Sequence, residues 1–136
     1  MITSEFEADL LENAFRGNST LPANYYLGLC NNSNIDRGMT LADINEVVGD
    51  GYSRIACSRS AAGWGEPIAQ ADCLAIRSQQ VNFTSTGQWT SFNRAFLCDV
   101  SEGTSGKLLA VSTPLPTEVS LASGTTYPVA FEFYLK

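Results

Sequence analysis

The sequence contains no histidine, and only two of its eight basic residues, Lys107 and Lys136, are lysines. Without imidazole the chain cannot form a Ser-His-Asp triad, a Cys-His dyad, or a zinc or haem site that depends on histidine. Charged residues make up only 16% of the chain, against a typical ~25%. These absences point away from enzymes, and we expect no catalytic residue, no cofactor and no metal site.

The sequence is also short of positive charge and of long apolar runs. Fourteen acidic and eight basic residues give a net charge of -6, which disfavours binding to a phosphate backbone. No run approaches the ~18 consecutive apolar residues of a membrane span, and acidic residues from Glu5 onward argue against a secretory signal. We expect a soluble protein made in the cytoplasm of its host, without direct contact with nucleic acid or membrane.

The four cysteines are too far apart for local metal or redox motifs. Their separations along the chain are 27, 16 and 25 residues, for Cys30, Cys57, Cys73 and Cys98. Three of them fall in apolar strand-like segments, as buried free cysteine does. Reduced structural thiols are therefore favoured, and at least one disulfide is the alternative. A catalytic thiol lacks a base to activate it.

The N-terminal segment predicts one amphipathic helix, from about residue 5 to 16. Ser4 and Glu7 have the spacing of a capping box, and Gly17 stands where a helix ends. Apolar side chains recur at helical spacing, at Phe6, Leu10, Leu11, Ala14 and Phe15. This helix either covers one side of a sheet or docks on a partner, and both alternatives remain open.

From residue 24 onward the sequence is typical of strands joined by Gly-, Ser-, Thr- and Pro-rich turns. Strands are predicted over 24–30, 52–59, 74–83, 89–98, 107–112 and 127–135, with a short one at 119–121 and a single helical turn over 40–43. Their regular spacing favours a mainly β fold, an antiparallel β-sandwich or flattened barrel with one N-terminal helix. We expect a single domain over 1–136, with the sandwich over about 24–136.

A polar loop after the first strand loosely follows a calcium-binding pattern. Asn32, Asn34 and Asp36 fall at alternate positions, but Gly38 comes one position late and Asp43 would have to replace the bidentate Glu. A polar turn is favoured over a calcium site.

Residues able to contact a partner stand in or beside predicted loops. Aromatic residues and arginine are enriched at protein interfaces. On this basis the contact candidates are Trp64, Arg59, Arg37, Tyr52, Asn32 and Asn34. Trp64 and Tyr52 have an inward-packed alternative, whereas Trp89 is expected in the core.

Short motifs in a fixed order connect the chain to a known group. They are Tyr26-Leu27-Gly28-Leu29, Val48-Gly49-Asp50-Gly51-Tyr52-Ser53-Arg54, Trp89, Gly106-Lys107-Leu108-Leu109-Ala110 and Ser123-Gly124 before the last strand. This arrangement resembles small tailed-bacteriophage virion proteins of the tail-fibre-like or head-decoration kind. Val47-Val48 stands where that pattern often has a proline, and the cysteines are not part of it.

The resemblance implies a structural subunit of a phage particle without catalysis. The favoured role is a capsid decoration (cement) protein on the external surface of the head, bridging copies of the major capsid protein. The alternative is a tail, baseplate or fibre-associated structural protein, with tail proteins as partners. A carbohydrate-binding sandwich that uses Trp64 and Trp89 in host recognition is a further alternative. In each role we expect a homo-oligomer, a dimer or trimer.

Overall fold

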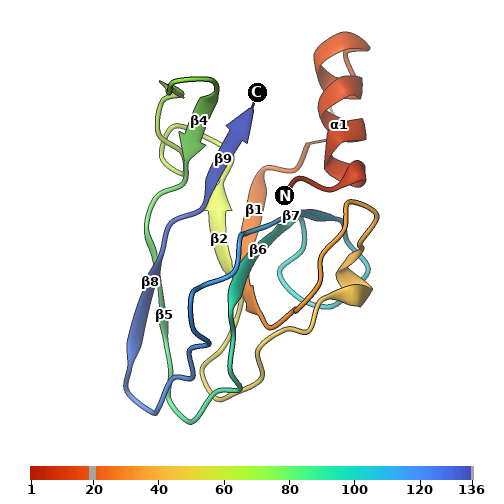
Figure 1. Cartoon of the computed structure of the whole chain (residues 1–136). Coiled ribbons are helices and arrows are strands. Elements are labelled where there is room, and N and C mark those ends of the chain that lie inside the picture. Colours follow the sequence, from red (N-terminus) through yellow and green to blue (C-terminus); the bar gives the residue numbers. More distant parts are fainter. Residues whose placement is uncertain (19–20, 136) are drawn as a thin grey trace.

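The computed structural model describes residues 1–18 and 21–135, and its elements follow the order of one helix and nine strands (Figure 1). Their bounds are α1 Ser4–Phe15, β1 Asn24–Cys30, the 3-10 helix η1 Leu41–Asp43, β2 Ile55–Ser58, β3 Ile68–Ala69, β4 Leu74–Arg77, β5 Val81–Thr84, β6 Arg94–Cys98, β7 Leu108–Val111, β8 Thr126–Val129 and β9 Glu132–Leu135. The fold is mainly β, with antiparallel sheets arranged as a sandwich. Over the described residues the sheets close into no barrel, so the sandwich alternative is confirmed.

Helix α1 begins one residue earlier than predicted, and its cap is a different residue. Thr3 is the N-cap, and its buried hydroxyl accepts a hydrogen bond from the Phe6 amide at 3.3 Å. The Thr3 amide donates to the Leu109 carbonyl at 3.0 Å, so the chain runs beside β7 up to that residue and turns into the helix only afterwards. The predicted Ser4–Glu7 capping box was therefore wrong. Gly17 ends the helix as expected, with a φ of 71°.

The main sheet has the strand order β2-β1-β6-β7, and both of its faces are buried. On one face Leu27 and Leu97 join the larger hydrophobic cluster, which the second layer covers. On the other face Phe96 and Cys98 join a smaller cluster with Met39, which belongs to the loop after β1. Burial on both faces explains why the chain from 24 to 30 is apolar at nearly every position.

The second layer is a long antiparallel ribbon with a break in its middle. The predicted strand 74–83 is divided into β4 and β5, and the predicted strand 127–135 into β8 and β9. Across the break, residues 78–80, between β4 and β5, lie opposite residues 130–131, between β8 and β9. The one extra residue between β4 and β5 shifts the register, as a β-bulge does. The Ser78 hydroxyl accepts from the Phe131 amide at 2.8 Å and replaces a ladder bond there. The bulge divides the ribbon into a β3-β4-β9 sheet and a β5-β8 pair.

Two other predicted strands are shorter than expected. The segment 52–59 is a strand only over β2, and 89–98 only over β6. Trp89 lies in the core as predicted, 2% exposed, but its segment is a loop whose Trp89 amide donates to the Leu121 carbonyl at 3.0 Å. The predicted strand 119–121 is reduced to an isolated bridge between Phe92 and Val119, and β3 was not predicted.

The loop from 31 to 54 covers the outer face of the main sheet and is held there by an ion pair between buried Arg54 and partly buried Glu46. Its helical turn over 40–43 is confirmed, with the Thr40 amide bonded to the Asp43 carboxylate at 2.8 Å. The Arg54 guanidinium, whose side chain is 3% exposed, donates to both carboxylate oxygens of Glu46 at 2.9 and 2.7 Å. The Tyr52 hydroxyl donates to the same carboxylate at 2.7 Å. This network fastens the loop to the sheet.

Replacing Glu46 with Gln leaves the buried Arg54 charge without its partner. We expect the variant to lose about 3 kcal/mol of unfolding free energy in urea titrations, as buried pairs do when one partner is removed. Glu7→Gln is the control, because its ion pair with Arg37 is exposed and such pairs contribute about 0–1 kcal/mol. Equal losses for the two variants would contradict the structural role of Glu46.

Gly28 lies so close to the second cluster that a Cβ atom there meets the Phe96 ring at 2.3 Å. That ring is also covered by the Arg54 guanidinium, 5.3 Å from its centroid, so it has little room to move. We expect Gly28→Ala to lower the unfolding free energy by about 1–3 kcal/mol in thermal unfolding experiments. Gly65→Ala, where the nearest atom is 3.7 Å away, is the control and should unfold near the wild-type temperature.

Candidate functional site

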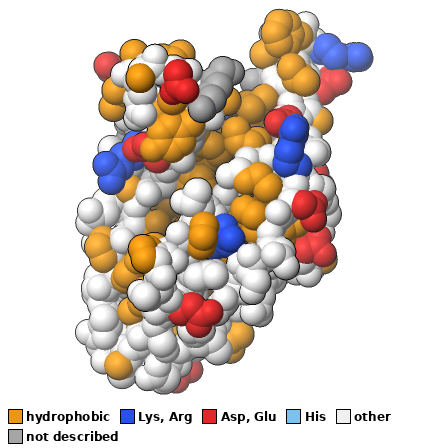
Figure 2. All heavy atoms as spheres, in the orientation of Figure 1, with side chains coloured by type: hydrophobic (Ala, Val, Ile, Leu, Met, Phe, Trp, Pro, Cys, Tyr) orange, Lys and Arg blue, Asp and Glu red, His pale blue; other side chains and the backbone are white. Residues whose placement is uncertain are grey.

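An apolar groove opens at one end of the sandwich, between α1 and the β3-β4-β9 sheet. Figure 2 shows it as a hollow lined with hydrophobic side chains, and its volume is about 850 Å³. Helix α1 stands on one side and β4 and β9 on the other (Figure 1). The lining residues are Ile2, Phe6, Leu10, Tyr25, Arg59, Ser60, Ala61, Trp64, Gly65, Glu66, Pro67, Leu74, Ala75, Ile76, Leu97, Phe133 and Leu135.

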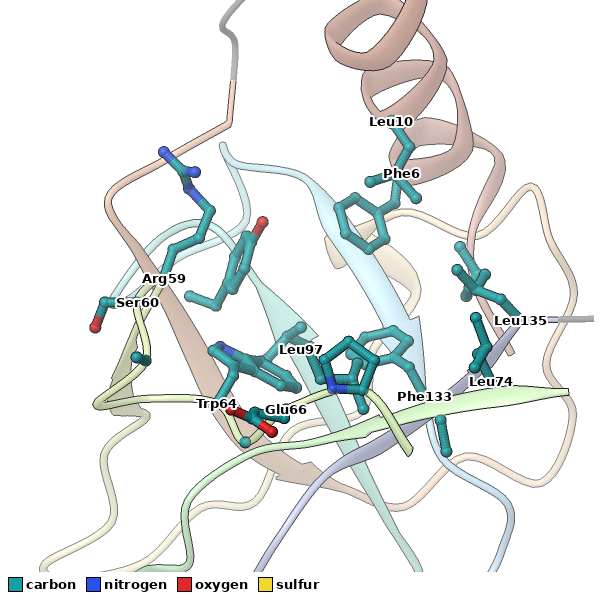
Figure 3. Close-up of a pocket in the computed structure, with 17 residues that line it drawn as sticks. Phe6, Leu10, Arg59, Ser60, Trp64, Glu66, Leu74, Leu97, Phe133 and Leu135 are labelled. Carbon is teal, nitrogen blue, oxygen red and sulfur yellow. The ribbon is translucent and has the colours of Figure 1, made fainter. Parts of the chain in front are cut away.

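Aromatic rings from separate parts of the chain form the centre of this groove (Figure 3). Phe6, in the first turn of α1, lies with its centroid 6.1 Å from the Tyr25 ring of β1 and 6.1 Å from the Phe133 ring of β9. Trp64, from the loop after β2, lies 6.2 Å from Tyr25 and 5.7 Å from Phe133. Such edge-to-face and tilted pairs stabilise one another beyond the area they bury. The groove therefore has a centre of packed aromatic rings.

Trp64 and Arg59, two of the predicted contact residues, both line the groove, in the wall contributed by the segment 59–67. Trp64 packs against Tyr25 and Phe133, as its inward-packed alternative expects, and it also lines the groove. Among the described residues its buried indole N–H has no hydrogen-bond acceptor. Arg59 is exposed and donates from Nε to the Pro22 carbonyl at 2.7 Å, which orients its guanidinium.

Few charges reach the groove. Arg59 and Glu66 are the charged residues of its lining. Burial raises the pKa of the Tyr25 hydroxyl, Arg59 opposes this change and Asp9 adds to it. Asp9 is itself paired with Lys107 at 2.8 Å, and that hydrogen bond raises the pKa of the lysine. An apolar occupant, whether a polypeptide or a small molecule, suits such a lining better than a charged one does.

The structure places the other contact candidates away from the groove. Tyr52 packs inward: its ring stacks on Phe83 with centroids 6.1 Å apart, and its hydroxyl accepts from the Leu29 amide at 2.9 Å. Burial raises the pKa of that hydroxyl. The inward-packed alternative therefore describes Tyr52. Arg37 is exposed and forms an ion pair with Glu7, which joins the loop after β1 to α1.

Asn32 and Asn34 line a separate polar hollow together with Asp36 and Asp43. The Asn32 side chain donates to the Asp43 carbonyl at 2.9 Å and accepts from the Asn45 amide at 3.0 Å. The Asp36 carboxylate accepts from the Gly38 amide at 2.8 Å. These bonds are those of the favoured polar turn. Across residues 1–18 and 21–135, no group of three or more His, Cys, Asp or Glu side chains is placed to hold a metal ion.

Several groove residues were not identified from the sequence. Phe6 and Leu10 were assigned to the apolar side of the helix, and Leu74, Phe133 and Leu135 to ordinary strands. The available signal was the amphipathic helix with its docking alternative. The position of the bulge that separates β4 and β9 from the rest of the ribbon has no comparable signal in the sequence.

Two comparisons with known proteins bear on this chain. A family model described as "Podophage GP4 fiber I protein gp80" matches residues 1–132. No curated protein matches the sequence. Within the described part of the chain, no helix has both the length and the hydropathy needed to cross a membrane. The matched range includes α1, the Gly-x-Gly-Tyr-x-Arg motif formed by residues 49–54, and the groove wall at 59–67.

The four cysteines are free, and their environments predict unequal reactivity. Cys30, Cys57 and Cys98 are buried, and burial raises the pKa of each thiol, to about 12 for Cys30. Cys73 alone is partly exposed. We expect one thiol per folded chain to react rapidly with a disulfide reagent at neutral pH, and all four after denaturation. Cys73→Ser should remove the rapid phase; rapid reaction persisting in that variant would contradict the assignment.

Proposed function

The chain belongs to the family of the podophage GP4 fiber I protein gp80 and is a virion structural protein of tailed phages, and from this we propose that its place in the particle is a tail fibre. Membership confirms the resemblance drawn from the order of its short motifs. The observation that carries the proposal is the match of the fibre family over residues 1–132.

The fibre assignment replaces head decoration as the favoured role. The name of the matched family fits the tail or fibre alternative better than a cement protein on the external surface of the head. The partners we propose are accordingly other structural proteins of the tail, in place of the major capsid protein.

The distribution of covered and open surface supports a role in assembly. Both faces of the main sheet are covered within the chain, by the broken ribbon on one side and the loop from 31 to 54 on the other. The groove end leaves apolar side chains uncovered. Exposed apolar surface of this kind marks protein contacts. The proposed role needs binding free energy but no proton transfer, so it includes no catalysis and no cofactor.

The carbohydrate-binding alternative gains nothing from the structure. Trp89 is buried, and its indole N–H donates to the Asp50 carbonyl at 2.8 Å. Of the two tryptophans only Trp64 reaches the groove, where its ring is packed against Tyr25 and Phe133. A paired aromatic platform for a sugar is therefore not formed by these residues.

The fibre assignment predicts where the protein lies on the virion. Gold-labelled antibodies against the full chain should mark the tail region in negative-stain images of the phage that encodes it. Particles lacking the protein should lose fibre density and adsorb less well to host cells, while their heads retain wild-type resistance to heat.

An antibody against the major capsid protein serves as the control for head labelling. Uniform head labelling by the antibody against this chain would contradict the fibre assignment. So would heads that open at lower temperature when the protein is absent, since a cement protein stabilises the shell it binds.

A further inference from the structure

The groove beside α1 has the size and the lining of a small-molecule site. Its volume of about 850 Å³ falls within the roughly 300–1,000 Å³ of typical ligand pockets. Aromatic rings form its centre, and aliphatic side chains from α1, β4 and β9 surround them, at Leu10, Leu74, Ile76 and Leu135. Such a lining suits an aliphatic chain, which needs no hydrogen bonds and gains free energy by leaving water.

The lining does not include every apolar side chain at this end of the molecule. Leu11 and Phe15 of α1 and Ile68 of β3 are strongly exposed there, but none of them lines the groove. Leu10, the neighbour of Leu11 on the same helix, does line it. Exposed apolar residues therefore remain open to protein contacts when the groove itself is occupied, and a ligand in the groove is compatible with a role in assembly.

The groove wall at 59–67 is fixed to both layers of the sandwich by backbone hydrogen bonds. The Arg59 amide donates to the Ala23 carbonyl, just before β1, at 2.9 Å. The Gly65 amide donates to the Arg77 carbonyl of β4, also at 2.9 Å. A wall that is ordered in advance loses little conformational entropy when a ligand binds to it.

This wall offers hydrogen-bond donors to a ligand. Arg59 donates from Nε to the Pro22 carbonyl at 2.7 Å, and among the described residues its two terminal nitrogens have no partner. The indole N–H of Trp64 is buried without an acceptor in the same part of the chain. None of the four ion pairs found in the described residues includes Arg59. The polar end of a ligand must therefore accept hydrogen bonds, and a negative charge on it complements the Arg59 guanidinium.

Glu66, the other charged residue of the lining, lies apart from Arg59. Figure 3 shows the Arg59 guanidinium and the Glu66 carboxylate on opposite sides of the Trp64 indole. No ion pair joins these two side chains in the described structure. An anionic group beside Arg59 therefore avoids the Glu66 carboxylate.

We propose that this groove binds an aliphatic carboxylate, a free fatty acid, with its tail among the aromatic rings and its head at the Arg59 guanidinium. Both parts of the ligand meet the wall that contains Trp64. The whole site belongs to one folded chain, so binding requires neither a second copy nor another virion protein. The inference goes beyond the proposed fibre location and does not depend on it.

The first test is the tryptophan fluorescence of the purified full-length chain during titration with decanoate. Trp64 is the reporter, because the other tryptophan, Trp89, is buried in the core and its indole N–H is already bonded. The emission should move to shorter wavelength as the tail excludes water, with a dissociation constant on the order of 100 μM. Trp64→Phe should abolish this change while titration calorimetry still detects binding. An emission spectrum unchanged at millimolar decanoate would overturn the proposal.

A series of ligands separates the tail from the head. Hexanoate should bind at least about tenfold more weakly than decanoate, because each buried methylene adds to the affinity. Decyltrimethylammonium has the same tail with a cationic head and should also bind more weakly. Tighter binding of this ammonium compound would place the head at Glu66 and overturn the assignment. Binding to phosphatidylglycerol vesicles as tight as to decanoate would overturn a free acid as the ligand.

Matched variants locate the two parts of the site. Leu10→Glu should raise the dissociation constant of decanoate about tenfold or more, because a charge enters the apolar lining. Leu11→Glu, next to it but outside the lining and 59% exposed, should leave the constant unchanged. Arg59→Gln should weaken decanoate about tenfold and leave decanol unaffected. Its control is Arg37→Gln, which removes an exposed arginine that pairs with Glu7 and does not line the groove.

Wild-type affinity for decanoate in Leu10→Glu would overturn the place of the tail, and in Arg59→Gln it would overturn the place of the head. Should Leu10→Glu lose the circular dichroism of the folded chain, Leu135→Glu takes its role, because Leu135 lines the groove and is 59% exposed. Failure of these tests leaves the fibre location untouched, because antibody labelling tests that separately.

Discussion

The ion pair of Arg54 and Glu46 fixes the loop from 31 to 54, which has no strand that would attach it to a sheet. The Arg54 guanidinium binds both oxygens of the Glu46 carboxylate and also donates to the Val100 and Gly103 carbonyls, at 3.1 and 2.9 Å. Every nitrogen of the Arg54 guanidinium therefore has an acceptor, which offsets the cost of taking its charge out of water. The loop from 31 to 54, which contains η1 but no strand, is thereby fastened over the outer face of the main sheet.

With that face closed, the open surface of the protein is determined by the second layer. The bulge at residues 78–80 separates the β3-β4-β9 sheet from the β5-β8 pair. The β5-β8 half contributes Phe83 to the larger cluster. Helix α1, through Phe6, and β9, through Phe133, also pack on this cluster, and beyond it α1 and the β4-β9 half form the two sides of the groove. A core that is complete on two faces and open at one end suits a subunit of a virion, which functions by contact with other subunits.

Family membership and geometry contribute different information. The match to a podophage fibre family identifies the chain as part of a virion. The geometry shows which surface is open: Trp64, Arg59 and the exposed side of α1 lie at one end, whereas Tyr52 and Arg54 of the Gly-x-Gly-Tyr-x-Arg motif bind Glu46 in the interior. The motif that made the family recognisable is therefore structural, and the contact surface that we propose lies outside it.

The sequence by itself determined the helix to within one residue, β1, the turn over 40–43, the mainly β class and the burial of Trp89, because each depends on local spacing or on apolar content. It also determined the virion class, through the order of short motifs. Only the tertiary structure decided that Thr3 caps the helix, that a bulge divides two long strands, and that Phe6, Trp64 and Phe133 meet in one groove. These features depend on contacts between residues far apart in the chain, which local periodicity does not record.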